Sequence, residues 1–174
     1  TMEKTRQVYA AHIERMFTLA GRKDAKAAAA NAMALETAIA KVQQADVVRR
    51  DPRKVYHRVD RIGLEKKLAP TFPWGDYLAK LNIPKVTAIT VNDPPYYTAV
   101  GRLLDTEKPA VLRDYLTWTV LRDSASALGS AWVAEAHTMS KELAGVKEIP
   151  PRWRRCVNRV DNDLGELLGQ AYVK

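Results

Sequence analysis

Two adjacent prolines, Pro150 and Pro151, precede the longest amphipathic pattern of the chain. Proline fits the first turn of a helix and is poorly tolerated in its interior. Beyond the prolines, apolar residues recur at spacings of three and four, the period of one helical face, at Trp153, Val157, Val160, Leu164 and Leu168. This pattern predicts one long helix with a buried apolar face. Trp153 is expected to anchor it in the core, so that Trp153→Ala would cost about 3–5 kcal/mol as a large-to-small core substitution.

Helical spacing of apolar residues extends through most of the 174-residue chain. Helices are expected over residues 3–20, from Asp24 toward Val48, from Asp93 to Leu104, from near Pro109, and after Gly129. The first two should form an antiparallel hairpin, whereas the apolar positions after Pro109 nearly encircle their helix and predict burial on most sides. The expected fold is all-α: a multi-helix bundle of antiparallel helices, with at most one short β-like segment, forming a single helical domain over residues 1–174.

The shorter segments between these helices carry local signals. Asp51 and Pro52 have the pattern of a helix N-cap followed by a first-turn proline. Residues 56–60 look extended, and Asp60 should begin a short helix that ends before Pro70. Residues 85–91 are the β-like run, which must pair elsewhere or serve as a connector because a lone strand is unstable. Trp74 is expected to pack in the core.

Composition excludes several classes of protein. With 47% hydrophobic residues the chain is too apolar for a disordered segment. The net charge is +8, and the basic excess is densest over residues 49–67. A solvated basic face is the commoner interpretation of such a run, and a nucleic-acid surface is the alternative. No apolar run approaches the ~20 residues of a membrane span, and no signal peptide begins the chain. Cys156, the one cysteine, is expected to be a small buried side chain, and the minority alternative is a reactive thiol activated by Arg154 and Arg155.

Residues with catalytic or metal-binding chemistry do not form a known pattern. A zinc protease needs two imidazoles four residues apart on one helical face, and the three histidines, His12, His57 and His137, lack that spacing. Each is expected to be at the surface or partly buried. Glu135 lies two residues from His137, so their side chains point to different faces of a helix. No catalytic, cofactor-binding or metal-binding residue is predicted in this chain.

Three groups of charged residues leave alternatives open. An acidic and amide-bearing turn does not match a calcium loop and is better explained as exposed charge; its members are Asn158, Asp161, Asn162, Asp163 and Glu166. An arginine cluster either forms structural ion pairs with Asp161 and Asp163 or lines a cavity or a partner lobe; its members are Arg152, Arg154, Arg155 and Arg159. Glu36 is either a buried structural carboxylate or a surface residue, with equal weight.

Several short motifs occur in the order seen in one enzyme family. They are Trp74-x-x-Tyr77-Leu78, Tyr115-Leu116-Thr117-Trp118, and Arg152-Trp153-Arg154-Arg155-Cys156-Val157 followed by Leu164-Gly165, Leu168-Gly169 and Tyr172-Val173. In this order and spacing the chain resembles the N-terminal, non-catalytic lobe of the neprilysin-like zinc metalloendopeptidases, which include neprilysin, endothelin-converting enzyme and bacterial oligoendopeptidases.

The resemblance implies a parent enzyme with two mostly helical lobes around a water-filled cavity. One lobe binds zinc through His-Glu-x-x-His and a later Glu, and the other, which this chain matches, caps the cavity and restricts access to peptides. The implied partners are the catalytic lobe of the same chain and peptide substrates, with no nucleic acid and no membrane segment in this part. The zinc motif is missing here, so the chain alone should be inactive, with zinc only in the parent.

The resemblance also bears on where such a parent occurs. It implies an extracytoplasmic parent, either periplasmic, secreted or membrane-anchored, and the lack of the disulfides common in animal members suggests a bacterial one. Two alternatives follow from the residues themselves. The first is a stand-alone basic helical module that binds nucleic acid or a protein partner, and the weaker second is a self-assembling helical scaffold.

Overall fold

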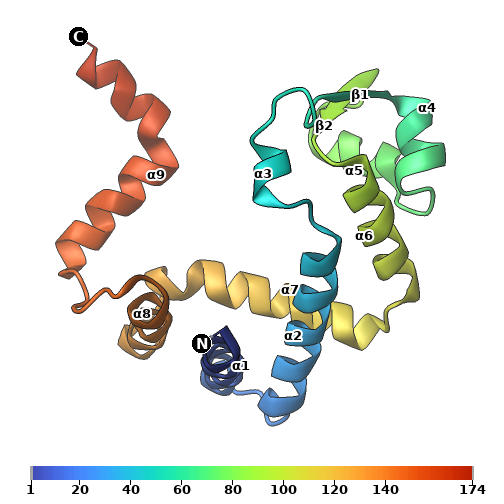
Figure 1. Cartoon of the computed structure of the whole chain (residues 1–174). Helices are drawn as coiled ribbons and strands as arrows, with labels where there is room; N and C mark the ends of the chain where they lie inside the picture. Colours follow the sequence, from blue (N-terminus) through green and yellow to red (C-terminus); the bar gives the residue numbers. More distant parts are fainter. Residues whose placement is uncertain (1, 174) are drawn as a thin grey trace. The chain divides into compact units, whose positions relative to one another are not determined.

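The computed structural model describes residues 2–173, which are predominantly helical (Figure 1). This confirms the predicted fold class of helices with a short β-like part. In chain order the elements are α1 (Met2–Leu19), α2 (Ala25–Val42), α3 (Asp46–Arg49), β1 (His57–Asp60), α4 (Arg61–Gly63), the π-helical turn η1 (Leu64–Leu68), α5 (Trp74–Lys80), β2 (Ala88–Val91), α6 (Pro94–Thr106), α7 (Pro109–Ser124), the 3-10 turn η2 (Ala125–Ala127), α8 (Ser130–Ala144) and α9 (Arg152–Tyr172).

The described chain divides into two compact units. The central unit is Ile13–Asp123, and the terminal unit comprises the described parts of Thr1–His12 and Ser124–Lys174. The single helical domain over residues 1–174 stays a prediction. Within residues 2–173, none of the helices is both long enough and apolar enough for a membrane crossing.

The two strands form one small antiparallel sheet in the central unit. His57 pairs with Val91 at one end of the ladder and Asp60 with Ala88 at the other. The β-like run predicted at residues 85–91 therefore finds its partner in the extended segment predicted at residues 56–60. A ladder of this length is marginal by itself, so its stability depends on packing against the neighbouring helices.

That packing is a small core around Trp74. Its buried members are Leu64, Leu68, Ala69, Trp74 and Val91. The Trp74 indole meets the Phe72 ring edge-to-face at 4.8 Å between centroids, and its Nε1 donates to the Ala69 carbonyl oxygen at 3.1 Å. The expectation that Trp74 is a core residue is confirmed. Gly101 brings α6 close to the same site, because a Cβ there would lie only 2.8 Å from the Ala69 Cβ.

Local capping signals are confirmed at two helix starts. The Asp93 carboxylate accepts a hydrogen bond from the Tyr96 amide at 3.1 Å, and Pro94 occupies the first turn of α6. The Asp60 carboxylate likewise accepts from the Gly63 amide at 2.7 Å at the start of α4. These caps depend only on neighbours in sequence, which is why the residue pattern predicts them.

Two other local predictions are wrong. Asp51 caps no helix. Its carboxylate accepts from the Arg53 amide at 3.0 Å inside a non-helical turn, because an aspartate side chain bonds the backbone of its own turn as readily as a helix start. The helix predicted to run toward Val48 ends at Val42, and the short α3 follows separately. Asp24 precedes α2 but makes no side-chain cap bond, since its carboxylate is bound by Arg22.

The expected hairpin of the first two helices is also different. Figure 1 shows α1 viewed along its axis and α2 running in the plane of the page, so the part of α1 in the central unit, Ile13–Leu19, crosses α2 steeply. Ile13, Met16 and Phe17 are fully buried at this crossing end, together with the alanine face of α2. The five-residue turn, with Gly21 in the left-handed region (φ 77°), permits either an antiparallel hairpin or a steep crossing of the two helices.

Two helices expose apolar residues that were expected to be buried. In α7 only Asp114 and Trp118 are buried, while Leu116 and Val120 are more than 60% exposed. In α9 no residue is buried, and Trp153 is 68% exposed, so it is not a core anchor. Cys156 is exposed as well. An apolar stripe shows that a helix needs a partner, and residues 2–173 do not supply one for these faces.

Candidate functional site

A buried histidine joins α1 and α8 in the terminal unit. His12 Nδ1 lies 2.7 Å from Glu135 Oε1, and the imidazole is only 4% exposed. The expectation that every histidine is at the surface or partly buried is therefore wrong for His12. The partners are 123 residues apart in sequence, and no local pattern indicates the pair. An imidazole this buried is out of reach of a substrate, so the pair is a structural link between the two helices.

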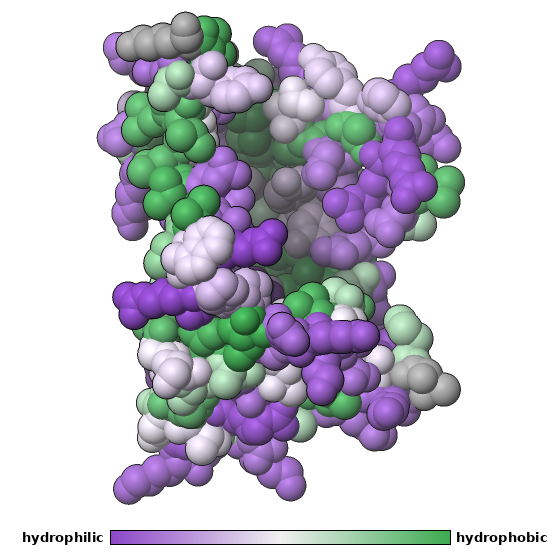
Figure 2. Space-filling model, turned by 90° about the vertical axis from the view of Figure 1, so that its left-hand side faces the viewer, coloured by the Kyte–Doolittle hydropathy of each residue, from purple (hydrophilic) through white to green (hydrophobic). Residues whose placement is uncertain are grey.

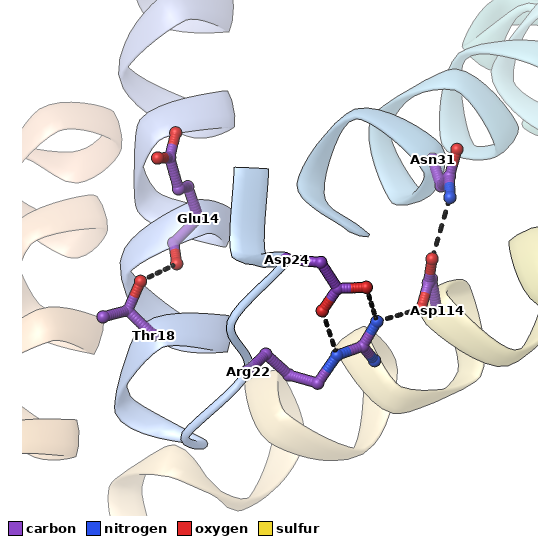
Figure 3. Close-up of polar contacts among 6 residues, drawn as sticks. All are labelled: Glu14, Thr18, Arg22, Asp24, Asn31 and Asp114. Atoms are coloured by element: carbon purple, nitrogen blue, oxygen red, sulfur yellow. Dashed lines mark hydrogen bonds and ion pairs between the residues drawn. The ribbon is translucent and has the colours of Figure 1, made fainter. Parts of the chain in front are cut away.

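A second polar cluster surrounds Arg22 in the central unit (Figure 3). The guanidinium donates from Nε to Asp24 Oδ1 at 2.7 Å and from Nη2 to Asp24 Oδ2 at 2.8 Å, a bidentate arrangement. The same Nη2 donates to Asp114 Oδ1 at 3.0 Å, and Asn31 Nδ2 donates to Asp114 Oδ2 at 2.8 Å. The cluster joins the α1–α2 turn, α2 and α7.

Electrostatics in this cluster follow from the hydrogen bonds. The bonds to Asp24 and then Asp114 raise the pKa of Arg22, which therefore stays charged at any working pH. The bond from Arg22 lowers the pKa of Asp24 below the ordinary aspartate value. Every donor of the cluster that the structure records points to a carboxylate of the same cluster. The cluster is therefore a structural link between helices.

Glu36 is a partly buried structural carboxylate and not a surface residue, the two alternatives that its sequence context left open. Its side chain is 21% exposed, and Oε1 accepts from Trp118 Nε1 at 3.1 Å and lies 3.6 Å from Arg122 Nη1. These bonds hold α2 against α7. Burial, and next the negative charge of Glu36, raise the pKa of Tyr115 on α7.

We expect Tyr115 to ionise above the ordinary tyrosine pKa of about 10. Because the folded-state pKa is raised, the contribution of the phenol to stability is complete below pH about 10 and is lost as the pH rises through the folded-state pKa. The difference in tyrosinate absorbance between the wild type and Tyr115→Phe reports this titration. Glu36→Gln, which keeps an oxygen acceptor but removes the charge, should bring the midpoint down. A Tyr115 midpoint at or below the ordinary value would contradict the assignment.

The arginine cluster of α9 borders an open groove of about 920 Å³ in the terminal unit. Its walls are the η2–α8 junction on one side and, on the other, the face of α9 that carries Arg152, Arg155 and Arg159. Arg159 pairs with Asp163, which is one of the ion pairs predicted. Among the described residues, Arg155 Nε is buried without a hydrogen-bond partner. The groove offers cationic donors but no nucleophile beside a base.

None of these residues fits a zinc ion. Across residues 2–173, no three His, Cys, Asp or Glu side chains converge closely enough to bind a metal. His57 Nε2 lies 2.9 Å from the Lys54 carbonyl oxygen, and His12 contacts Glu135. The acidic turn of α9 is spread along an exposed helix. We therefore derive no zinc-dependent step from this chain.

Comparison with known proteins places the chain in a family. The N-terminal model of Peptidase family M13 matches residues 1–174. The chain belongs to Peptidase family M13. The resemblance to neprilysin-like metallopeptidases seen in the motifs is thereby confirmed.

Curated M13 relatives are much longer than the chain. Human endothelin-converting enzyme 1 is 30% identical over 144 residues, which cover 80% of this chain and 19% of that protein. Mouse neprilysin is 24% identical over 153 residues, which cover 82% of this chain and 20% of the relative. The chain thus spans about a fifth of the length of these relatives.

Solved structures of an M13 protein share the fold. The Mycobacterium tuberculosis zinc metalloprotease Zmp1 in its open state matches with a TM-score of 0.91 and 27% identity, over 98% of this chain and 27% of Zmp1. Its complex with an inhibitor matches with a TM-score of 0.90 and 28% identity over the same shares. The fold described above is therefore that of a corresponding part of a longer metalloprotease chain.

Proposed function

We propose that this chain is the non-catalytic helical portion of an M13 zinc metalloendopeptidase, which encloses the reaction cavity and restricts access to peptides. The observation that carries the proposal is the family match over residues 1–174, combined with polar clusters that fasten helices together. A rigid helical wall would admit short flexible peptides, exclude folded proteins and keep bulk water from the site. Zinc and the catalytic residues would belong to the rest of the enzyme, which acts outside the cytoplasm of a bacterium.

The basic-module alternative has less support. In the basic region, Arg61 Nε lies 3.0 Å from Glu65 Oε1 and Arg49 Nη1 lies 3.5 Å from Asp46 Oδ1. Local carboxylates thus offset part of the positive charge that a nucleic-acid surface would need.

The first test compares peptidase activity of two proteins. The purified 174-residue chain, supplied with zinc, is expected to show no zinc-dependent cleavage of a quenched fluorescent peptide. A longer M13 protein that contains this chain is expected to cleave the peptide and to lose activity with a chelator. Zinc-dependent cleavage by the 174-residue chain itself would overturn the proposal.

The steric role has its own test in the longer protein. The same cleavable sequence is presented once as a free peptide and once inside a stably folded domain. The free peptide is expected to be cut and the folded substrate to be spared. Equal rates of cleavage would remove the proposed role in restricting access, since a wall that excludes folded proteins must discriminate between the two.

A further inference from the structure

The outer face of α9 is an apolar surface without cover. Its stripe comprises Trp153, Val157, Val160, Leu164 and Leu168, and all five side chains are exposed. Figure 2 looks from the side on which α9 lies in Figure 1 and shows hydrophobic atoms along this helix at the surface. Leu164 has non-helical backbone angles (φ −125°, ψ 18°), so α9 is kinked there and the stripe follows the helix across the kink. Scattered apolar residues are normal on a surface, but an exposed stripe of this kind marks an interface.

The orientation of α9 strengthens this reading. Arg155 and Arg159 border the groove beside α8, and of the stripe only Val160, at its edge, lines the groove as well. The helix therefore turns its cationic face to its neighbours and most of its apolar face to solvent, the reverse of the arrangement that water favours for an amphipathic helix. A partner that covers the stripe would remove this conflict.

We propose that α9 docks through this stripe onto the part of the M13 chain that lies outside these 174 residues. The inference rests on the proposed function and names the surface by which the helical portion joins the remainder. The match with Zmp1 covers 98% of this chain but only 27% of that protein, so a relative of that length has ample further chain to cover the helix. The occupant is an apolar groove of that remainder.

The charges beside the stripe indicate what the docking partner carries, and they disfavour a second copy of this chain as that partner. On the helical wheel Arg152 and Arg154 flank the stripe on its two sides, and within residues 2–173 neither has an ion pair. The docking groove is therefore expected to carry carboxylates near the start of α9. A second copy of this chain would instead bring another net charge of +8 to the same surface.

Hydrogen exchange of α9 tests the proposal without any substitution. In the 174-residue chain the amides of residues 152–172 are expected to exchange quickly, and in the longer M13 protein at least about tenfold more slowly, because local opening then breaks a packed interface. Equal exchange in the two proteins would overturn the proposal. Slow exchange in the 174-residue chain that grows with concentration, with a dimer in light scattering, would also overturn it in favour of self-association.

A matched pair of variants in the longer protein identifies the face involved. Val157→Asp places a carboxylate in the stripe at a position that does not line the groove, and is expected to restore fast exchange of α9. Asn162→Asp adds the same charge on the groove-facing side and is expected to leave the protection unchanged. If both variants or neither removed the protection, the stripe would not be the docking face. Protection of α9 in a longer protein without peptidase activity would defeat the proposed function and leave the docking intact.

Discussion

Replacing Trp118 by alanine is expected to lower the free energy of unfolding by about 3–5 kcal/mol, the usual cost of deleting a buried aromatic side chain. Trp118 is the largest fully buried side chain of the described residues. Its indole also donates to Glu36 at 3.1 Å, which ties α7 to α2. The substitution therefore opens a cavity and removes one hydrogen-bond donor to a partly buried carboxylate. Urea denaturation of the 174-residue chain, followed by far-ultraviolet circular dichroism, measures the loss.

Trp153→Ala is the matched control, because it deletes the same side chain from an exposed position. In the 174-residue chain its effect should stay within about 0.5 kcal/mol, as for other surface substitutions. Trp118→Phe separates the two contributions at the buried site, since it retains most of the ring but cannot donate to Glu36. Similar losses for Trp118→Ala and Trp153→Ala would show that the burial assigned to the two tryptophans is wrong.

These two tryptophans also show what the amino-acid sequence can and cannot predict. Both belong to motifs shared with the neprilysin-like family, and both lie on helices that the apolar spacing predicts. A periodic stripe indicates that a helix has an apolar face, but it does not say whether the covering partner lies in the same segment. Trp153 was therefore expected in the core and is exposed, whereas Trp118 lies in a helix that is buried on one side only.

Features that depend on neighbouring residues were predicted in part, since the caps expected at Asp51 and Asp24 are absent. The Asp93–Pro94 start of α6 and the Asp60 cap of α4 follow from hydrogen bonds across one helical turn. The pairing of His57–Asp60 with Ala88–Val91 was half predicted, since both segments looked extended but only the structure shows that they meet.

Polar links between distant helices were not predictable in the same way. His12 and Glu135 are separated by 123 residues, and Glu36 and Trp118 by 82. A single sequence gives the residue types on each helix but not the distance between helices. It therefore contains no pattern that indicates which distant residues pair. Family membership was predictable for a different reason, because it depends on the order of short motifs along the chain.

Asp114→Ala is expected to be the second most damaging substitution, with a loss of about 2–3 kcal/mol in the free energy of unfolding. Asp114 on α7 is buried and accepts from Arg22 at 3.0 Å and from Asn31 of α2 at 2.8 Å. Its removal leaves the partly buried Asn31 amide without this acceptor, which costs at most about 1–3 kcal/mol, the penalty of an unsatisfied buried polar group. The remainder comes from the lost charge-assisted bond, reduced because Arg22 is partly exposed and keeps Asp24.

Asp24→Ala removes the solvent-exposed partner of the same Arg22 guanidinium. Asp24 makes two bonds to Arg22, one more than Asp114, yet its side chain is exposed, so water replaces the lost partner and the loss should be much smaller. Counting hydrogen bonds would rank Asp24 above Asp114, whereas desolvation ranks Asp114 first. Urea denaturation of the two variants decides between these rankings, and a larger loss for Asp24→Ala would mean that burial does not set the strength of this cluster.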